Sequence, residues 1–149
     1  MWDIRRFSEL SATEVHDLYQ LRAEVFVLEQ RCVYQDVDGK DFEAIHVLHY
    51  DKNKSELIAY GRIFLPTQED ANARFGRIVI RKNQRGKGLA KELVQEIIRW
   101  IKGETTQPIK ISAQHYLIEF YQGFGFEIMG DPYDEDGILH IDMIKPCRD

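Results

Sequence analysis

The spacing of apolar residues along the chain predicts an alternation of strands and helices. Apolar residues alternate with polar ones over residues 2–7, which predicts a short first strand. Ser11 followed three residues later by Glu14 matches a capping box, and apolar residues then recur at helical spacing as far as Val27. A first helix is therefore expected here. The polar string EQRCVYQDVDGKD that follows predicts a loop or a short second helix.

Six later segments have the composition of strands. The first two, AIHVLHY and ELIAYGRIFL, flank the turn string DKNKS and predict an antiparallel hairpin. They are followed by FGRIVIR, IKISA, FEIMG and ILHIDMI, and the acidic string DPYDEDG is expected as a loop between the last two. The apolar stripe of Leu89, Leu93 and Ile97 predicts a helix, and YLIEFYQ predicts a shorter one that ends at Gly123. This order predicts an α/β (α+β) fold with a mixed sheet covered by helices.

Composition adds limits on size and location. The chain has 149 residues, of which 44 % are hydrophobic, and no Pro/Gly/Ser-rich linker, so a single domain over residues 1–149 is expected. No stretch approaches the roughly 20 apolar residues of a membrane span, and the N-terminal residues lack the apolar region of a signal peptide. A soluble cytoplasmic protein without a membrane partner is expected.

The cysteines give no sign of a disulfide framework or a metal site. Cys32 and Cys147 stand in no CxxC pattern and at no metal-ligand spacing from a histidine. A partly buried thiol is the expected state of Cys32, in preference to a nucleophile. No metal ion is expected.

Positive charge is concentrated in one segment of an acidic chain. The formal net charge is −5, yet seven basic residues and no acidic one lie between Ala71 and Lys91. The net acidity argues against nucleic acid as the partner. A strand that runs through a short glycine loop into a helix presents unpaired N–H groups at the positive end of the helix dipole, and Gly86 and Gly88 let the backbone approach a phosphate. The segment predicts an anion site, pyrophosphate in particular, or else a solvated basic loop.

Two common phosphate-binding motifs do not match this segment. A P-loop needs Ser or Thr after Gly-Lys, where this chain has Gly88, and no Gly stands five residues before Gly86. The dinucleotide fingerprint needs a third glycine, where this chain has Lys91. The segment is therefore neither a P-loop nor a dinucleotide fingerprint.

Several strings across the chain carry the motifs of one known family. Residues 83–88 read NQRGKG, and Tyr121, Gly125 and Phe126 form a Tyr-x-x-x-Gly-Phe string. Further matching strings, which extend over nearly the whole chain, are LRAEVFVLEQRCVYQDVDGKD, GRIVI, SAQHYLIEFYQGFGF and YDEDGILHIDM. Together they resemble the GNAT family of acetyl-CoA-dependent N-acetyltransferases and are similar to its ElaA-like branch. The loop of that family reads Gln/Arg-x-x-Gly-x-Gly/Ala, so Asn83 is a departure at the first position.

The resemblance implies a fold and a cofactor. The fold is a bent, mostly antiparallel sheet of about seven strands with helices on both faces, whose fourth and fifth strands splay apart to admit the pantetheine arm. The cofactor is acetyl-CoA as co-substrate. Its pyrophosphate is assigned to the backbone of residues 85–90, and its pantetheine amides to the preceding strand. These cofactor-binding residues are Ile78, Val79, Ile80, Arg85, Gly86, Lys87, Gly88, Leu89 and Ala90.

The resemblance also suggests two catalytic residues. Tyr121 is carried over as the general acid, because a phenol can protonate a leaving thiolate once the geometry is set; its alternative is a packing role among phenylalanines. The fourth strand has no carboxylate to act as base. His140 is the preferred substitute, since the fold places its strand beside the acceptor cleft and imidazole titrates near neutrality. An exposed strand histidine is the alternative, and His46, Glu29 or a water chain are reserves.

Acidic residues suggest the class of acceptor. They cluster in two segments that border the acceptor side in the family's architecture, and solvated loops are the alternative reading. The segments contain Asp36, Asp38, Asp41 and Glu43, and Asp131, Asp134, Glu135 and Asp136. They favour a primary amine of a small molecule or peptide as acceptor. The expected assembly is left open between a monomer and a homodimer. A non-catalytic acyl-CoA sensor and a nucleic-acid patch are competing hypotheses.

Overall fold

The computed structural model describes residues 2–147, in which seven strands form one sheet in the order β1-β2-β3-β4-β5-β7-β6. The strands are β1 (Asp3–Arg6), β2 (Ile45–Tyr50), β3 (Leu57–Phe64), β4 (Ala73–Ile80), β5 (Ile109–Gln114), β6 (Glu127–Glu135) and β7 (Ile138–Lys145). The α-helices are α1 (Ala12–Arg22), α2 (Leu89–Glu104) and α3 (Ile118–Gln122). Shorter helical turns are η1 (Phe7–Glu9), the π-helical η2 (Ala23–Glu29), η3 (Lys82–Gln84) and η4 (His115–Leu117). The described residues include no helix long and apolar enough to cross a membrane.

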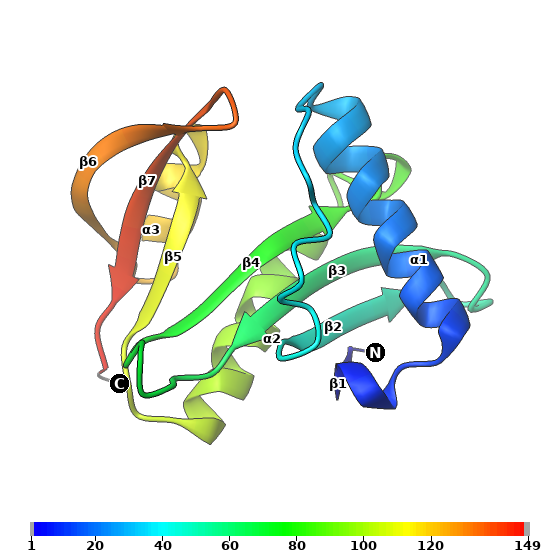
Figure 1. The fold of residues 1–149 in the computed structure, drawn as a ribbon, viewed down its shortest axis with the longest axis horizontal. Coiled ribbons are helices and arrows are strands. Elements are labelled where there is room, and N and C mark those ends of the chain that lie inside the picture. Colours follow the sequence, from blue (N-terminus) through cyan, green and yellow to red (C-terminus); the bar gives the residue numbers. More distant parts are fainter. Residues whose placement is uncertain (1, 148–149) are drawn as a thin grey trace.

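The sheet opens at one strand pair. Every neighbouring pair is antiparallel except β4 and β5, which are parallel and pair only at Ala73 with Ile109 and at Arg74 with Lys110. Beyond these two pairs the strands diverge, and Figure 1 shows β5, β7 and β6 leaning away from β4. The predicted mixed, mostly antiparallel sheet with splayed central strands is confirmed.

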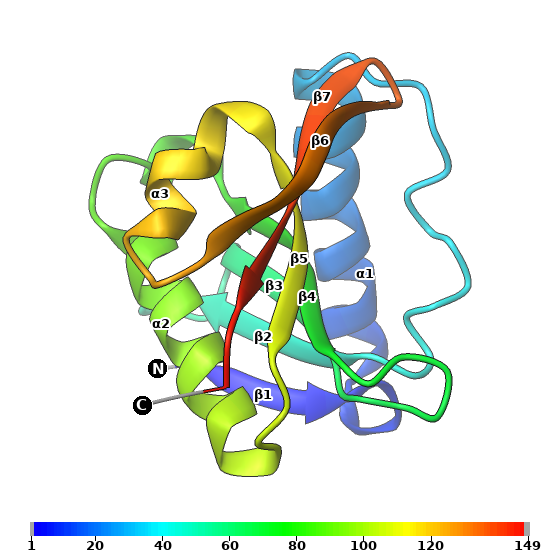
Figure 2. The same ribbon diagram turned by 90° about the vertical axis from the view of Figure 1, so that its left-hand side faces the viewer.

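Helices cover both faces of the sheet, as predicted. Figure 2 shows α1 on one face and α2 and α3 on the opposite face. In the apolar stripe of α2, Leu93 and Ile97 are fully buried against the strands and Leu89 is partly buried, whereas α1 packs a second, smaller cluster around Leu18, Leu21 and Tyr60. Burying such aliphatic side chains contributes about 1.5–3 kcal/mol each. The two clusters hold β4 from both sides, which fixes the strand that opens the sheet.

The first helix begins where the capping box predicts. The Ser11 hydroxyl accepts a hydrogen bond from the Glu14 amide at 3.1 Å, and the Glu14 carboxylate accepts one from the Ser11 amide at 2.8 Å. The chain then continues from α1 into η2, as the helical spacing up to Val27 predicted, but with π-helical geometry, which periodicity did not indicate. Residues 30–44 contain turns and bends but no helix, so the loop alternative is the right one.

The expectation of an acidic loop between the last two strands is wrong. Strand β6 continues through Glu135, with Tyr133 opposite His140 and Glu135 opposite Ile138. The chain reverses over Asp136 and Gly137 alone, both at positive φ (52° and 83°). Asp-Gly is a typical two-residue hairpin turn, so this dipeptide was the relevant signal within the string. The acidic side chains therefore stand on a strand and its tight turn.

Candidate active site

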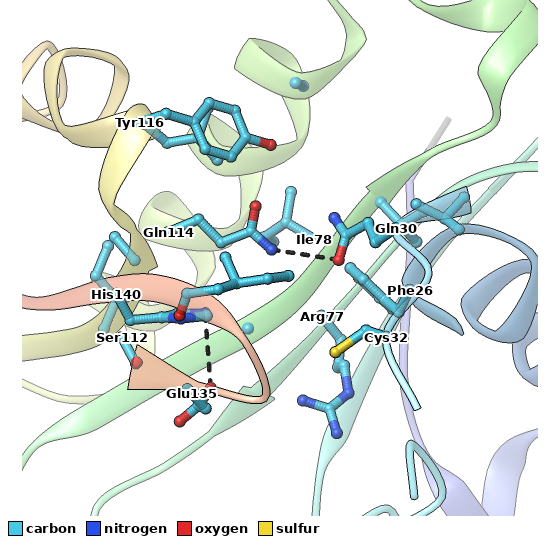
Figure 3. A pocket seen from close by; sticks show the side chains of 18 of the residues that line it. Phe26, Gln30, Cys32, Arg77, Ile78, Ser112, Gln114, Tyr116, Glu135 and His140 are labelled. Atoms are coloured by element: carbon cyan, nitrogen blue, oxygen red, sulfur yellow. Dashed lines mark hydrogen bonds and ion pairs between the residues drawn. The ribbon is translucent and has the colours of Figure 1, made fainter. Parts of the chain in front are cut away.

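A cavity of about 520 Å³ lies where β4 and β5 diverge. Both strands contribute to its walls, together with η2, the loop that follows it, α3 and the β6–β7 turn. Figure 3 shows side chains from these elements converging on this space. Segments from most of the chain thus meet at one place, and the opening of the sheet is what brings them together.

Strand β4 carries a bulge at the cavity. Its register against β3 shifts between Tyr60 and Arg62, and Arg77 adopts a φ of 51°, in the left-handed region that non-glycine residues rarely occupy. Such a conformation costs on the order of 1–3 kcal/mol. Asp36 holds it in place, because its carboxylate accepts a hydrogen bond from Arg77 Nε at 2.8 Å.

The free edge of β4 offers backbone groups to a ligand. Ile78, Val79 and Ile80 line the cavity, and β4 pairs with β5 only as far as Arg74. A strand edge without a neighbour presents unpaired N–H and C=O groups. This arrangement suits an extended chain that contains amides, as the sequence comparison with the GNAT family implied for these residues.

The glycine loop forms the N-terminus of α2 as predicted. Gly86 and Gly88 have φ of 82° and 81°, and a Cβ built on either would meet no atom within 4 Å. Gly88 is the N-cap and no side chain caps the helix, so the amides of the first turn have no partner within the described residues. Exposed amides at the positive end of a helix dipole suit a phosphate group.

The basic side chains around this loop divide into two groups. Arg81 forms ion pairs with Glu24 and Glu56 at 2.9 Å each. Arg85 binds both oxygens of Glu29, at 2.6 and 2.9 Å, and this hydrogen bonding lowers the pKa of that carboxyl group. Lys82 and Lys87 are exposed and make no ion pair within the described chain. The lysines, rather than the arginines, are therefore the side chains free to meet an anion.

Tyr121 lies in the wall of the cavity. It comes from α3, is only 6 % exposed, and packs edge-on against Phe120 and Phe126. Its hydroxyl makes no hydrogen bond to any described residue. Burial raises the pKa of the phenol, which therefore stays protonated across the physiological range. Tyr121 therefore packs among the phenylalanines and also lines the cavity. Its role as general acid stays a prediction.

His140 also lines the cavity, on β7. It is 7 % exposed, so the alternative of an exposed strand histidine is wrong. Its Nδ1 lies 2.8 Å from the carbonyl oxygen of Ile138. Because a carbonyl can only accept, Nδ1 carries the hydrogen, and in a neutral ring Nε2 keeps its lone pair. Nε2 lies 3.6 Å from the Glu135 carboxylate, as the dashed line in Figure 3 marks.

The reserve bases are less suitable. His46 is fully buried, and its two ring nitrogens lie 2.6 Å from the Tyr60 hydroxyl and 2.8 Å from the carbonyl oxygen of Asp41. It does not line the cavity. Glu29 does, but its carboxylate is bound by Arg85. The geometry therefore favours His140 among the candidate side chains.

A family model described as an acetyltransferase (GNAT) domain matches residues 13–147 of this chain. The chain belongs to the GNAT acetyltransferase family. A UPF0039 protein of Synechocystis sp. is 40 % identical over 144 residues, which cover 96 % of this chain and 93 % of that protein. Protein ElaA of Escherichia coli is 35 % identical over 147 residues, with 97 % and 95 % covered. The predicted membership of the ElaA-like branch is confirmed.

Solved structures support the same assignment. The crystal structure of Escherichia coli ElaA matches with a TM-score of 0.89 at 36 % identity, covering 97 % of this chain and 98 % of that one. An acyl-CoA N-acyltransferase from Pseudomonas aeruginosa matches with a TM-score of 0.91 at 32 % identity, covering 97 % and 99 %. The GNAT family uses acyl-CoA, and the free β4 edge and the glycine loop provide backbone groups that fit such a ligand.

The first acidic segment is not the free acidic rim that the sequence suggested. Asp36 and Asp41 are 7 % and 2 % exposed. Arg22, which is fully buried, donates to both carboxylates at 2.8 and 2.7 Å. Burial alone would raise the pKa of Asp41, but the hydrogen bonds and positive charges of Arg22 and Arg62 together outweigh it, and the pKa lies below its ordinary value. Arginines therefore pair with the three aspartates of this segment, whereas Glu43 is exposed and forms no ion pair among the described residues.

The same ion network holds the loop after η2 in place. Arg62 on β3 binds Asp38 and Asp41, and Arg77 on β4 binds Asp36. The loop that carries Cys32 and Tyr34 into the cavity is therefore tied to the sheet. Removing one partner of a buried ion pair typically costs about 3–5 kcal/mol, so this loop is rigid rather than a mobile lid.

Two contacts between distant segments close the cavity. The Cys32 thiol donates to the carbonyl oxygen of Asp136 at 2.9 Å, and the Gln114 amide donates to Gln30 at 3.4 Å. Burial, followed by the charge of Asp136, raises the pKa of the Cys32 thiol, so it stays neutral and is a poor nucleophile, as expected. Sequence inspection missed Gln30 and Gln114 because nothing in their local pattern indicates a partner far along the chain.

Proposed function

We propose that this GNAT protein is an N-acetyltransferase that moves the acetyl group of acetyl-CoA to a primary amine of a small molecule or peptide. The amine attacks directly within a ternary complex. The observation that carries the proposal is that one cavity is lined by the free edge of β4, by Arg85 and Ala90 of the glycine loop, and by both Tyr121 and His140. Acetyl-CoA supplies the activated acyl group. The residues of this chain hold the two substrates in place and transfer the protons.

Each part of the site has a role in this proposal. The loop amides and Lys82 and Lys87 hold the phosphates, and the β4 edge orients the pantetheine arm. A new C–N bond forms while the C–S bond breaks. Nε2 of His140 takes the first proton from the ammonium, which frees the lone pair for attack, and the Tyr121 hydroxyl gives its proton to the departing sulfur. The nitrogen loses a second proton as the amide forms, and this proton returns to the Tyr121 oxygen. The reaction therefore releases one proton overall, through His140.

Binding of acetyl-CoA is expected to raise the melting temperature of the protein. A ligand at about 100 times its dissociation constant adds about 2.7 kcal/mol of stability, which corresponds to roughly 5–10 °C for a domain of this size. We expect both acetyl-CoA and CoA to give such a shift, and ATP to give a smaller one because it lacks the pantetheine arm. Thermal denaturation with each ligand measures it. No shift with either CoA species would refute the proposed cofactor.

Two glycine variants test whether the glycine loop binds the phosphates of CoA. Gly86→Ala places a Cβ on a residue at φ 82° and is expected to weaken the CoA-induced shift. Gly103→Ala adds the same methyl group within α2, where a Cβ meets no atom within 4 Å, and should leave the shift unchanged. Equal shifts in the two variants would argue against the loop as the phosphate site.

A further inference from the structure

The second acidic segment differs from the first in forming no ion pair with an arginine or lysine among the described residues. Asp131, Asp134 and Asp136 form no ion pair within the described chain, and the ion pair of Glu135 is with His140. The Asp134 carboxylate accepts a hydrogen bond from the Gly137 amide and so builds the turn, and Asp136 offers its carbonyl oxygen to Cys32. Glu135 is the carboxylate on β6 that both lines the cavity and keeps its oxygens available.

Glu135 and His140 face each other at the cavity. The Glu135 side chain is 54 % exposed, whereas that of His140 is 9 % exposed, and 3.6 Å separates Oε2 from Nε2. Nε2 makes no hydrogen bond to a described residue, so a buried lone pair is directed at the cavity beside a carboxylate. Figure 3 shows Glu135 below His140 at the end of the hairpin. A primary ammonium has three N–H donors and can bind both groups.

The surroundings favour an amine with an apolar body. Tyr133 stacks on the His140 ring, and Gln114 lies opposite His140 on β5. Across the cavity, Phe26 and Tyr34 provide aromatic surface, and Arg77, whose guanidinium is paired with Asp36, stands over the Tyr34 ring. Aromatic surface of this kind suits an apolar or aromatic group on the acceptor.

We propose that Glu135 binds the ammonium group of the acceptor and delivers it to Nε2 of His140, and that the acceptors are cationic primary amines with an apolar or aromatic body. This inference rests on the proposed function. It assigns recognition of the ammonium group to the β6–β7 hairpin alone. The first acidic segment, which sequence suggested as an equal contributor, serves as scaffold instead.

The test uses phenethylamine as the probe and phenethyl alcohol as its neutral analogue, titrated into the CoA-saturated protein and followed by protein NMR. Wild type is expected to bind the amine more tightly than the alcohol. Glu135→Gln should raise the dissociation constant of the amine about fivefold, the effect of losing one half-exposed charge pair, and leave that of the alcohol unchanged. Glu135→Asp keeps the negative charge and should lose less affinity for the amine than Glu135→Gln does.

Asp131→Asn is the matched control, because it removes one negative charge from the same strand at an exposed position. It should bind the amine as wild type does. Equal weakening in both variants, unchanged binding in Glu135→Gln, or no preference of wild type for the amine would each overturn the proposal. The titration needs no turnover, so a failure of the proposed acetyl transfer shows separately, as absence of amine-dependent CoA release.

Discussion

Replacing Tyr121 by Phe is expected to lower kcat at least about 100-fold, since a positioned general acid typically contributes 10²–10⁴-fold. The ring and its edge-on contacts with Phe120 and Phe126 are retained. The hydroxyl makes no hydrogen bond within the described chain, so neither stability nor the KM for acetyl-CoA should change appreciably. Steady-state kinetics of CoA release with a saturating amine measures the effect.

Tyr116→Phe is the matched control for this variant. Tyr116 also lines the cavity, but it lies in η4 and is 74 % exposed. Removing its hydroxyl should leave kcat within about twofold, because an exposed phenol has water as an alternative partner. If Tyr116→Phe and not Tyr121→Phe slowed turnover, the proton donor would have been assigned to the wrong tyrosine.

Replacing His140 by Ala is expected to lower kcat/KM for the amine by about 100-fold or more at neutral pH. Without the base, the reaction depends on the small neutral fraction of an amine whose ordinary pKa is about 10. The loss should therefore be largest at low pH and shrink as the pH approaches about 10. Rates of wild type and variant across this pH range provide the comparison.

Two further variants guard this result against a folding artefact. His140→Gln retains a side chain that can donate to the Ile138 carbonyl oxygen but has no titratable base, and it should be as slow as His140→Ala. His16→Ala, on the exposed surface of α1, should behave as wild type. A ratio of wild-type to variant rates that stays constant up to high pH would exclude His140 as the base.

Local patterns predicted much of this fold because local chemistry decides it. The capping box at Ser11 and the 3.6-residue stripe of α2 are each complete within a few turns of chain. The same holds for the glycine loop, where φ near 80° at Gly86 and Gly88 is a property of those residues alone. The splayed strands are a different case: the resemblance to the GNAT family implied them, and no local pattern did.

The features that sequence missed depend on partners far apart in the chain. Asp36 and Asp41 look like a solvated acidic run, but Arg22, Arg62 and Arg77 reach them from three other elements. The left-handed backbone of Arg77 is likewise held by a side chain 41 positions away. A run of acidic residues in a sequence can therefore be a buried ion-pair network, and its sequence alone does not show that it binds a substrate.

The β6–β7 hairpin shows a milder error of the same kind. The acidic string was expected as a loop, yet its Asp-Gly dipeptide makes a tight turn and the preceding residues pair with β7. This pairing is what brings Glu135 beside His140. Strand pairing restricts the backbone that carries a carboxylate more than a loop does. The proposed binding of the acceptor's ammonium group by Glu135 depends on this restriction.

The central claim is transfer of an acetyl group from acetyl-CoA to an amine, and product analysis tests it most directly. The protein is incubated with acetyl-CoA and phenethylamine, and the N-acetylated amine and free CoA are quantified together by mass spectrometry. We predict that the two products accumulate in equal amounts, at a rate that Tyr121→Phe lowers at least about 100-fold. CoA binding without any acetylated product, for this amine or for a broad panel of primary amines, would contradict the account.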